Sequence, residues 1–166
     1  TTAATVDLLR RLGQRVEIVP MATSFAQIRD VVLLMGQLTG EEQRAQTLIT
    51  DFDTRLAEVK ARAVVRSQAP RPRAVAMQVN SLASGEGSLI NEVLGEAGFD
   101  NVARYAKLGP AGRLPLETLI SDPPEVIVRA NDASDFRTVL GDNLRHPAFR
   151  ALEATRPSIH IPMNEW

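Results

Sequence analysis

Hydrophobic residues between positions 39 and 73 recur every three or four positions, the period of an α-helix that buries one face. At 1.5 Å per residue, a helix over residues 41–66 would be about 39 Å long. This pattern predicts a stiff spacer between two lobes that enclose a cleft. The residues of the expected buried stripe are Ala45, Leu48, Ile49, Phe52, Leu56, Val59 and Ala63.

The ends of this helix are also predicted from the sequence. Thr39 and Glu42 have the spacing of a capping box, which places the start of the helix at Thr39. Pro70 and Pro72 cannot continue a helix, so it should not extend beyond Gln68. Because its middle contains no glycine or proline, we expect the helix to resist bending.

The segment before the spacer predicts a helix over residues 1–12 that stops at Gly13, followed by a strand over 15–19. Ser24 and Gln27 resemble a second capping box, which opens a helix that ends near Gly36. A single strand cannot satisfy its own backbone, and the chain also stops directly after a strand-like segment at 158–161. We therefore expect the chain to be a fragment of something longer.

Strand and helix patterns alternate after the spacer, which predicts a parallel or mixed sheet with covering helices. The expected division is 1–38 as the remnant of an N-terminal lobe, 39–69 as the linker helix and 70–166 as a C-terminal α/β lobe. The expected strands are 74–79, 126–128 and 158–161, and the expected helices are 89–96, 115–120 and 147–153.

Composition excludes several classes of function. The 166 residues carry 19 basic and 20 acidic side chains, with one Trp and one Tyr, so a nucleic-acid partner is not expected. No run is long enough to span a membrane, and no signal peptide is visible. The chain has no cysteine, which excludes disulfides and thiolate ligands but leaves the compartment open.

Ligands of open α/β sheets lie beyond the carboxyl ends of the strands, so the first candidate is the loop at 80–88. Its candidate ligand-binding residues are Asn80, Ser81, Ser84 and Gly85. Glycines permit close backbone approach, and free N–H groups of the following helix suit anionic oxygens. The alternative is that the loop merely forms a turn and that Ser88 caps the helix.

Two further candidates follow strands. Arg129 and Asn131 come directly after the strand at 126–128, where a guanidinium would match paired anionic oxygens. Alternatively, Arg129 pairs with Asp132 or Asp135 at the surface. Trp166 follows the last strand and is a candidate flat wall for a large planar ligand, although an aromatic side chain there could simply complete a core.

Histidine bears on the class of ligand. Sites for bare zinc or manganese use several imidazoles with a carboxylate, whereas this chain has only His146 and His160, in different settings. No metal site and no cofactor are therefore expected in this chain, and a preformed chelate is favoured as the ligand.

Four segments carry a resemblance to a known family: 89–102, 114–128 with its Leu-Pro-Leu-Glu-Thr-Leu start, 146–152 with its His-Pro-Ala-Phe start, and 156–162, which is similar to the closing strand. Their order around the spacer helix is similar to that of the ABC-transporter periplasmic substrate-binding proteins whose lobes are joined by one long helix. Members of this class serve iron siderophores, haem, cobalamin and some bare metals.

The resemblance implies an α/β fold with two lobes of Rossmann-like layers joined by one long α-helix. It also implies that the N-terminal lobe is incomplete and that a final C-terminal helix is missing. The implied function is extracytoplasmic, in the periplasm: a metal chelate (ferric siderophore, cobalamin or haem) is bound in the interlobe cleft and passed to a membrane permease, with no catalytic residue.

Two alternatives remain. One is an α/β enzyme that holds a phosphorylated substrate at the Ser84–Ser88 loop, with Asp132, Asp135 or His146 as acid or base. The chain lacks a nucleophile elbow, a Walker lysine and a full dinucleotide fingerprint. The other is an interaction module without a small ligand.

Overall fold

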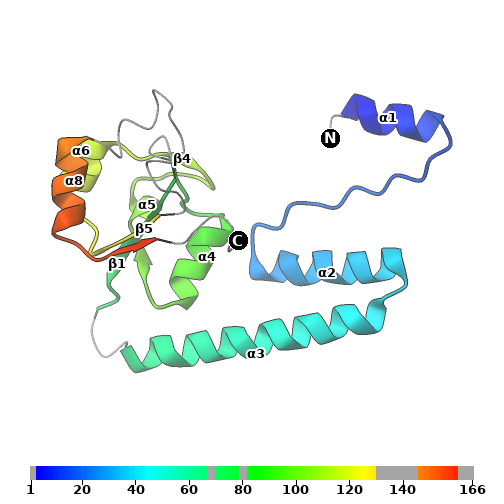
Figure 1. The fold of residues 1–166 in the computed structure, drawn as a ribbon, viewed down its shortest axis with the longest axis horizontal. Coiled ribbons are helices and arrows are strands. Elements are labelled where there is room, and N and C mark those ends of the chain that lie inside the picture. Colours follow the sequence, from blue (N-terminus) through cyan, green and yellow to red (C-terminus); the bar gives the residue numbers. More distant parts are fainter. Residues whose placement is uncertain (1–2, 67–69, 79–81, 130–145, 161–166) are drawn as a thin grey trace.

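The computed structural model describes residues 3–66, 70–78, 82–129 and 146–160. Its helical part consists of α1 (Ala3–Arg11), α2 (Phe25–Thr39) and α3 (Glu42–Arg66). α2 and α3 lie antiparallel and form a helical hairpin, whereas α1 lies apart at the end of an extended segment (Figure 1). The strand expected at 15–19 does not form, since no neighbouring strand pairs with it among the described residues.

A mixed sheet forms the second part of the structure, which we call the sheet unit. Its strands have the order β4-β2-β1-β5-β6, and β3 pairs with the first residues of β1. β3, β5 and β6 run parallel to their partners, whereas β2 pairs antiparallel with both β1 and β4. The strands are β1 (Arg73–Met77), β2 (Leu82–Ala83), β3 (Asp100–Asn101), β4 (Gly112–Arg113), β5 (Val126–Arg129) and β6 (Ser158–His160).

Among the described residues, four helices belong to the sheet unit: α4 (Leu89–Glu96), α5 (Val102–Tyr105), α6 (Leu116–Ser121) and α8 (Pro147–Ala154). α6 and α8 pack against each other at the far side of the unit, whereas α4 faces α2 and α3 (Figure 1). The unit has one apolar core, formed by Val75, Met77, Ala83, Val102, Ala103, Leu114, Leu119, Ile127 and Phe149. The expected α/β class is therefore confirmed.

The boundary between α2 and α3 differs from the prediction. α2 continues past Gly36 to Thr39, and Gly40 ends it in the left-handed region with φ 73°. The Thr39 hydroxyl donates to the carbonyl oxygen of Met35 at 2.8 Å, so Thr39 closes α2 and does not cap α3. Gly36 is buried where the two helices pack, and the prediction that it stops α2 is wrong.

The start of α2 is nearly as expected. The Ser24 Oγ accepts from the backbone N–H of Gln27 at 3.1 Å, as in a capping box. The Gln27 side chain reaches back one residue further than the motif predicts, because its Oε1 accepts from the N–H of Thr23 at 2.7 Å.

The long helix α3 has 25 residues and contains neither glycine nor proline. Of its expected stripe, Ala45 and Ile49 are buried, but Leu48 is 54% exposed and Val59 42% exposed. The ring of Phe52 meets that of Phe25 edge to face, with centroids 5.6 Å apart, and the Arg29 guanidinium lies 5.4 Å from its centroid. Aromatic contacts therefore fix the middle of α3 on the start of α2. None of the helices that the structure describes is long and apolar enough to cross a membrane.

Candidate functional site

The carboxyl ends of β1, β5 and β6 meet at one edge of the sheet because the three strands are parallel. Met77, Arg129 and His160 stand side by side in the register at this edge. Ligands of such sheets bind beyond the carboxyl ends of the strands. This edge, with the start of the loop after β2, is therefore the candidate site.

Arg129 is placed by the last position of β5 and has a side chain that is only 17% exposed. Its Nε lies 2.9 Å from the Oε1 of Glu153 on α8, whose side chain is 21% exposed. The Ser158 hydroxyl donates to the same oxygen at 3.1 Å. A carboxylate that the sequence analysis did not consider thus balances the charge of Arg129, while Asp132 and Asp135 lie outside the described residues.

Gly85 has no side chain because the backbone at positions 108 and 109 passes too close. A Cβ on Gly85 would clash with the carbonyl oxygen of Leu108, and the Gly85 N–H donates to the carbonyl of Gly109 at 3.1 Å. The close approach that this glycine permits is therefore one within the protein. Ser84 precedes it, is partly buried and offers its carbonyl oxygen to a side chain of the core.

Ser88 caps α4, as the alternative interpretation of this loop expected. Its Oγ accepts from the Asn91 N–H at 3.1 Å and its hydroxyl donates to the Gly85 carbonyl at 2.7 Å. Gly87 turns the chain with φ 81°. The described part of the loop is therefore held by its own hydrogen bonds, which does not favour a phosphate-binding role for Ser88.

Asn101 is a buried polar residue that the sequence analysis missed, with 3% of its surface exposed. Its Nδ2 donates to the Ser84 carbonyl and to Asn91 Oδ1, both at 2.9 Å, and its Oδ1 accepts from the Ala103 N–H at 3.1 Å. One amide thus ties the candidate loop to α4 and to the start of α5. The available signal was an asparagine directly before a short apolar helix, which is a typical N-cap.

The remaining predicted ligand-binding residues, Asn80, Ser81, Asn131 and Trp166, lie outside the described residues. His146 is exposed and begins α8, where its Nδ1 accepts from the Ala148 N–H at 3.2 Å. Within the described ranges, no group of three or more histidine and acidic side chains could hold a metal ion.

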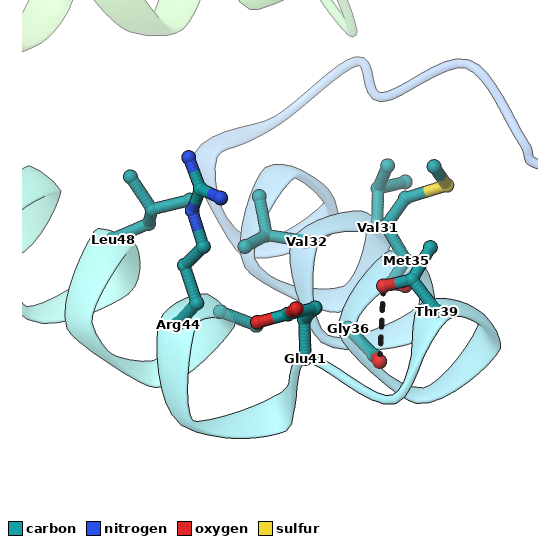
Figure 2. A pocket seen from close by; sticks show the side chains of 9 residues that line it. Val31, Val32, Met35, Gly36, Thr39, Glu41, Arg44 and Leu48 are labelled. Carbon is teal, nitrogen blue, oxygen red and sulfur yellow. Dashed lines mark hydrogen bonds between the residues drawn. The ribbon is translucent and has the colours of Figure 1, made fainter.

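The structure also has an apolar groove away from the sheet edge. It lies between α2 and α3, has a volume of about 420 Å³ and is lined mainly by aliphatic side chains, with Arg44 and Glu41 among its charged residues (Figure 2). The aliphatic residues include Val31, Val32, Met35, Ala45 and Leu48.

The fold resembles several solved structures. The periplasmic haem-binding protein of Vibrio cholerae matches 98% of this chain and 64% of its own length, with a TM-score of 0.77 and 16% identity. The periplasmic haem-binding protein of Roseiflexus sp. RS-1, in its apo form, matches 98% and 63%, with a TM-score of 0.76 and 20% identity. The periplasmic vitamin B12-binding protein of Vibrio cholerae matches 96% and 60%, with a TM-score of 0.67 and 17% identity.

The chain spans less than two thirds of the length of these structures. No curated protein sequence matches it. The family described as periplasmic binding protein matches residues 2–158, which is almost the whole chain. This protein therefore belongs to the periplasmic binding protein family.

Proposed function

We propose that this protein is the extracytoplasmic solute-binding component of an ABC importer, and that it delivers a metal chelate to a membrane permease. The cargo is a ferric siderophore, a cobalamin or a haem, and the protein acts in the periplasm. Support comes from the family match and from the solved structures of similar fold, whose names specify haem, vitamin B12 and, for one from Saccharomonospora viridis, Fe³⁺-hydroxamate transport.

The observation that carries the proposal is the row Met77, Arg129 and His160 at the carboxyl edge of three parallel strands. The cargo would contact this edge through Asn80, Ser81, Ser84, Arg129, Asn131 and Trp166, while Gly85, whose N–H is bonded to the Gly109 carbonyl, would shape the loop. Arg129 is the side chain best suited to an anionic group of the chelate, since a guanidinium has five N–H donors and one carboxylate does not occupy them all. No covalent step is required.

The division of the chain follows from the same proposal. Residues 1–38 would belong to an N-terminal lobe, 39–69 to the linker and 70–166 to the C-terminal lobe. α3 would then hold the lobes at a nearly fixed distance, because a helix without glycine or proline bends little. Cargo capture would involve a small closure and not a wide hinge movement.

The test is a binding titration with hemin, cyanocobalamin and a ferric hydroxamate siderophore. Trp166 is the only tryptophan, so its fluorescence reports on its own surroundings. N-acetyltryptophanamide, titrated in parallel, corrects for absorption by the coloured ligands, and calorimetry gives the affinity independently. One of the three ligands should bind and quench the fluorescence of Trp166. The proposal would be contradicted if none of them bound and a phosphate ester instead stabilised the protein against unfolding.

Arg129→Gln should weaken binding of that chelate by about tenfold or more, the loss expected for one charge-assisted hydrogen bond. Arg150→Gln is the matched control, since Arg150 is exposed on α8 and is not one of the three residues of the register row. Equal affinities of the two variants would remove Arg129 from the site.

A further inference from the structure

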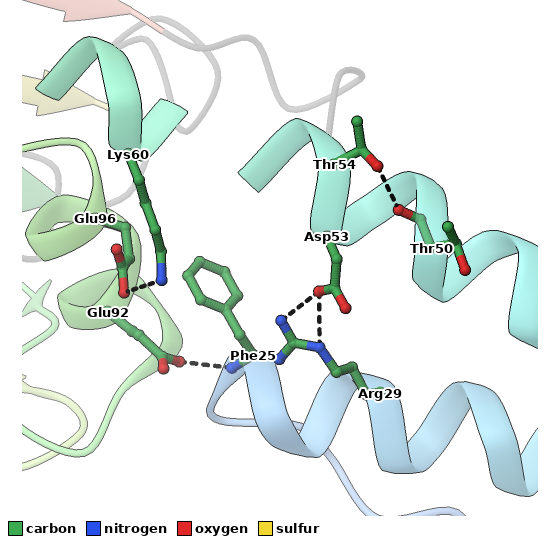
Figure 3. A network of polar contacts seen from close by, with 8 residues as sticks. All are labelled: Phe25, Arg29, Thr50, Asp53, Thr54, Lys60, Glu92 and Glu96. Carbon is green, nitrogen blue, oxygen red and sulfur yellow. Dashed lines mark hydrogen bonds and ion pairs between the residues drawn. The ribbon is translucent and has the colours of Figure 1, made fainter. Parts of the chain in front are cut away.

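Two carboxylates on α4 reach from the sheet unit to the helical hairpin. Glu92 Oε2 accepts from the backbone N–H of Phe25 at 2.6 Å, and Glu96 Oε1 lies 3.0 Å from Lys60 Nζ (Figure 3). The two acids are four residues apart, so they lie on the same face of α4. One contacts the start of α2 and the other contacts α3.

The Phe25 N–H is a group that needs a partner. Phe25 is the first residue of α2, and the first N–H groups of a helix have no acceptor within the helix. Ser24 already caps Gln27, so the cap on Phe25 comes from another element. A carboxylate is favoured at this position both as a strong acceptor and by its interaction with the helix dipole.

Among the described residues, this contact lies away from the contacts near the end of α3, where Lys60 pairs with Glu96. Gly98 meets Ala63, and Arg71 Nη1 donates to the Gly95 carbonyl at 3.4 Å, both near the end of α3. Contacts at the end of a helix alone leave it free to rotate about that end. The contact between Glu92 and Phe25 restrains the rotation, because Phe25 packs on Phe52 in the middle of α3.

α4 is fixed on its other side to the candidate loop. Asn91, the neighbour of Glu92, accepts from Asn101, which also donates to the Ser84 carbonyl. One short helix therefore contacts both the loop beside the sheet edge and the first turn of α2. The side chains concerned, Asn91 and Glu92, are consecutive in the sequence.

We propose that Glu92 is a positioning residue that sets the orientation of the helical hairpin relative to the sheet unit by accepting the hydrogen bond of the Phe25 N–H. Glu92 has no contact with cargo in this proposal. Its role is to hold α2 against α4, so that removing the acceptor leaves each part folded but loosens their mutual orientation.

The experiment measures that orientation directly and uses the full chain. The absence of cysteine allows two spin labels to be attached at Asp30→Cys on α2 and Glu117→Cys on α6, both exposed positions. Pulsed electron–electron double resonance then gives the distribution of distances between the two spin labels, one on each part. Circular dichroism confirms that each variant is folded.

Glu92→Ala should broaden the distance distribution, and Glu92→Gln, which keeps an oxygen acceptor, should retain the distribution of the parent. Glu58→Gln is the matched control, because Glu58 is exposed on α3 and pairs along that helix with Arg62. A distribution for Glu92→Ala that equals that of the parent would overturn the proposal. A Gln variant as broad as the Ala variant would overturn the hydrogen bond as its cause.

The donor can be removed as well. Proline is tolerated at the first position of a helix and has no N–H, so Phe25→Pro removes the ring and the donor, whereas Phe25→Ala removes only the ring. In the Phe25→Ala background, Glu92→Ala should broaden the distance distribution. In the Phe25→Pro background, where the donor is already absent, it should cause no further broadening. Equal broadening in both would contradict the proposal. No ligand is needed, so failure of this test leaves the proposed function untouched, and failure of chelate binding leaves this test intact.

Discussion

Gly36 and Ala45 touch where α2 crosses α3, and a Cβ built on Gly36 would lie 2.6 Å from the Cβ of Ala45. It would also lie 3.3 Å from the carbonyl oxygen of Glu41. Real Cβ atoms do not approach so closely, so the two helices pack at this distance only because position 36 carries no side chain.

Gly36→Ala should therefore destabilise the protein. Forcing a methyl group into this contact costs about 1–3 kcal/mol, the range for overpacked sites, which exceeds the gain from the better helix propensity of alanine. Denaturant unfolding measures the change. Gly95→Ala on α4 is the control, because its Cβ would meet nothing within 4 Å and should leave stability unchanged or raise it.

Asn101→Ala should loosen the loop beside the sheet edge. The substitution leaves the Ser84 carbonyl, Asn91 Oδ1 and the Ala103 N–H without this partner, and the unpaired Ala103 N–H, which is fully buried, costs about 1–3 kcal/mol. Hydrogen exchange should accelerate at positions 84–91 and at the start of α5. Exchange that is unchanged at 84–91 would show that the loop does not depend on Asn101.

Asp122 should contribute to the loss of stability of the sheet unit in acid. Arg73 donates to its two oxygens, with Nη2 2.6 Å from Oδ2, and this hydrogen bonding lowers the pKa of Asp122 below its usual value. A lowered pKa means that the stabilisation is present above the unfolded pKa of about 3.9 and is lost as pH falls through the folded pKa. Asp122→Asn should flatten this part of the curve of unfolding free energy against pH, whereas Asp51→Asn, an exposed position on α3, should not.

The hydroxyl of Tyr105 should lose its proton at a higher pH than that of an ordinary tyrosine. Its hydroxyl donates to Asp100 Oδ2 at 2.7 Å, and this hydrogen bond, followed by desolvation, raises the pKa of Tyr105 above its usual value of 10. The contact therefore stabilises the fold below the unfolded pKa and is lost as pH rises through the folded one. Tyr105 is the only tyrosine, so phenolate absorbance reads it directly. Asp100→Asn should lower the pH midpoint of the phenolate titration towards the midpoint of the protein unfolded in urea. An unchanged midpoint would contradict this assignment.

Local patterns predicted those elements whose ends carry a cap and a stop. α4 was expected at 89–96 and is found there, because Ser88 caps it and Gly98 follows it in the left-handed region with φ 85°. Gly36 shows the limit of the same rule. A glycine that ends a helix and one that admits a neighbouring helix look alike in the sequence, and only the position of Ala45 distinguishes them.

The elements that sequence analysis missed are short. β2, β3 and β4 have two residues each and α5 has four, which is too few for a period to be visible, and β2 lies within the segment expected to be the loop at 80–88. Contacts between distant residues were equally hidden. Glu92 and Phe25 are 67 positions apart, and Glu153 was not foreseen as the partner of Arg129, because no local pattern relates a strand end to a helix that follows much later.

α3 contacts the sheet unit near its C-terminal end, where Ala63 packs on Gly98. About 21 residues of helix extend from this contact to Glu42, a length of about 32 Å at 1.5 Å per residue. A tilt of about 5° at Ala63 would thus carry the opposite tip through about 3 Å, by the same geometry. Small changes of tilt near Gly98 would therefore be amplified into displacements of ångströms at the opposite end of the helix, and the contact between Glu92 and Phe25 opposes such changes.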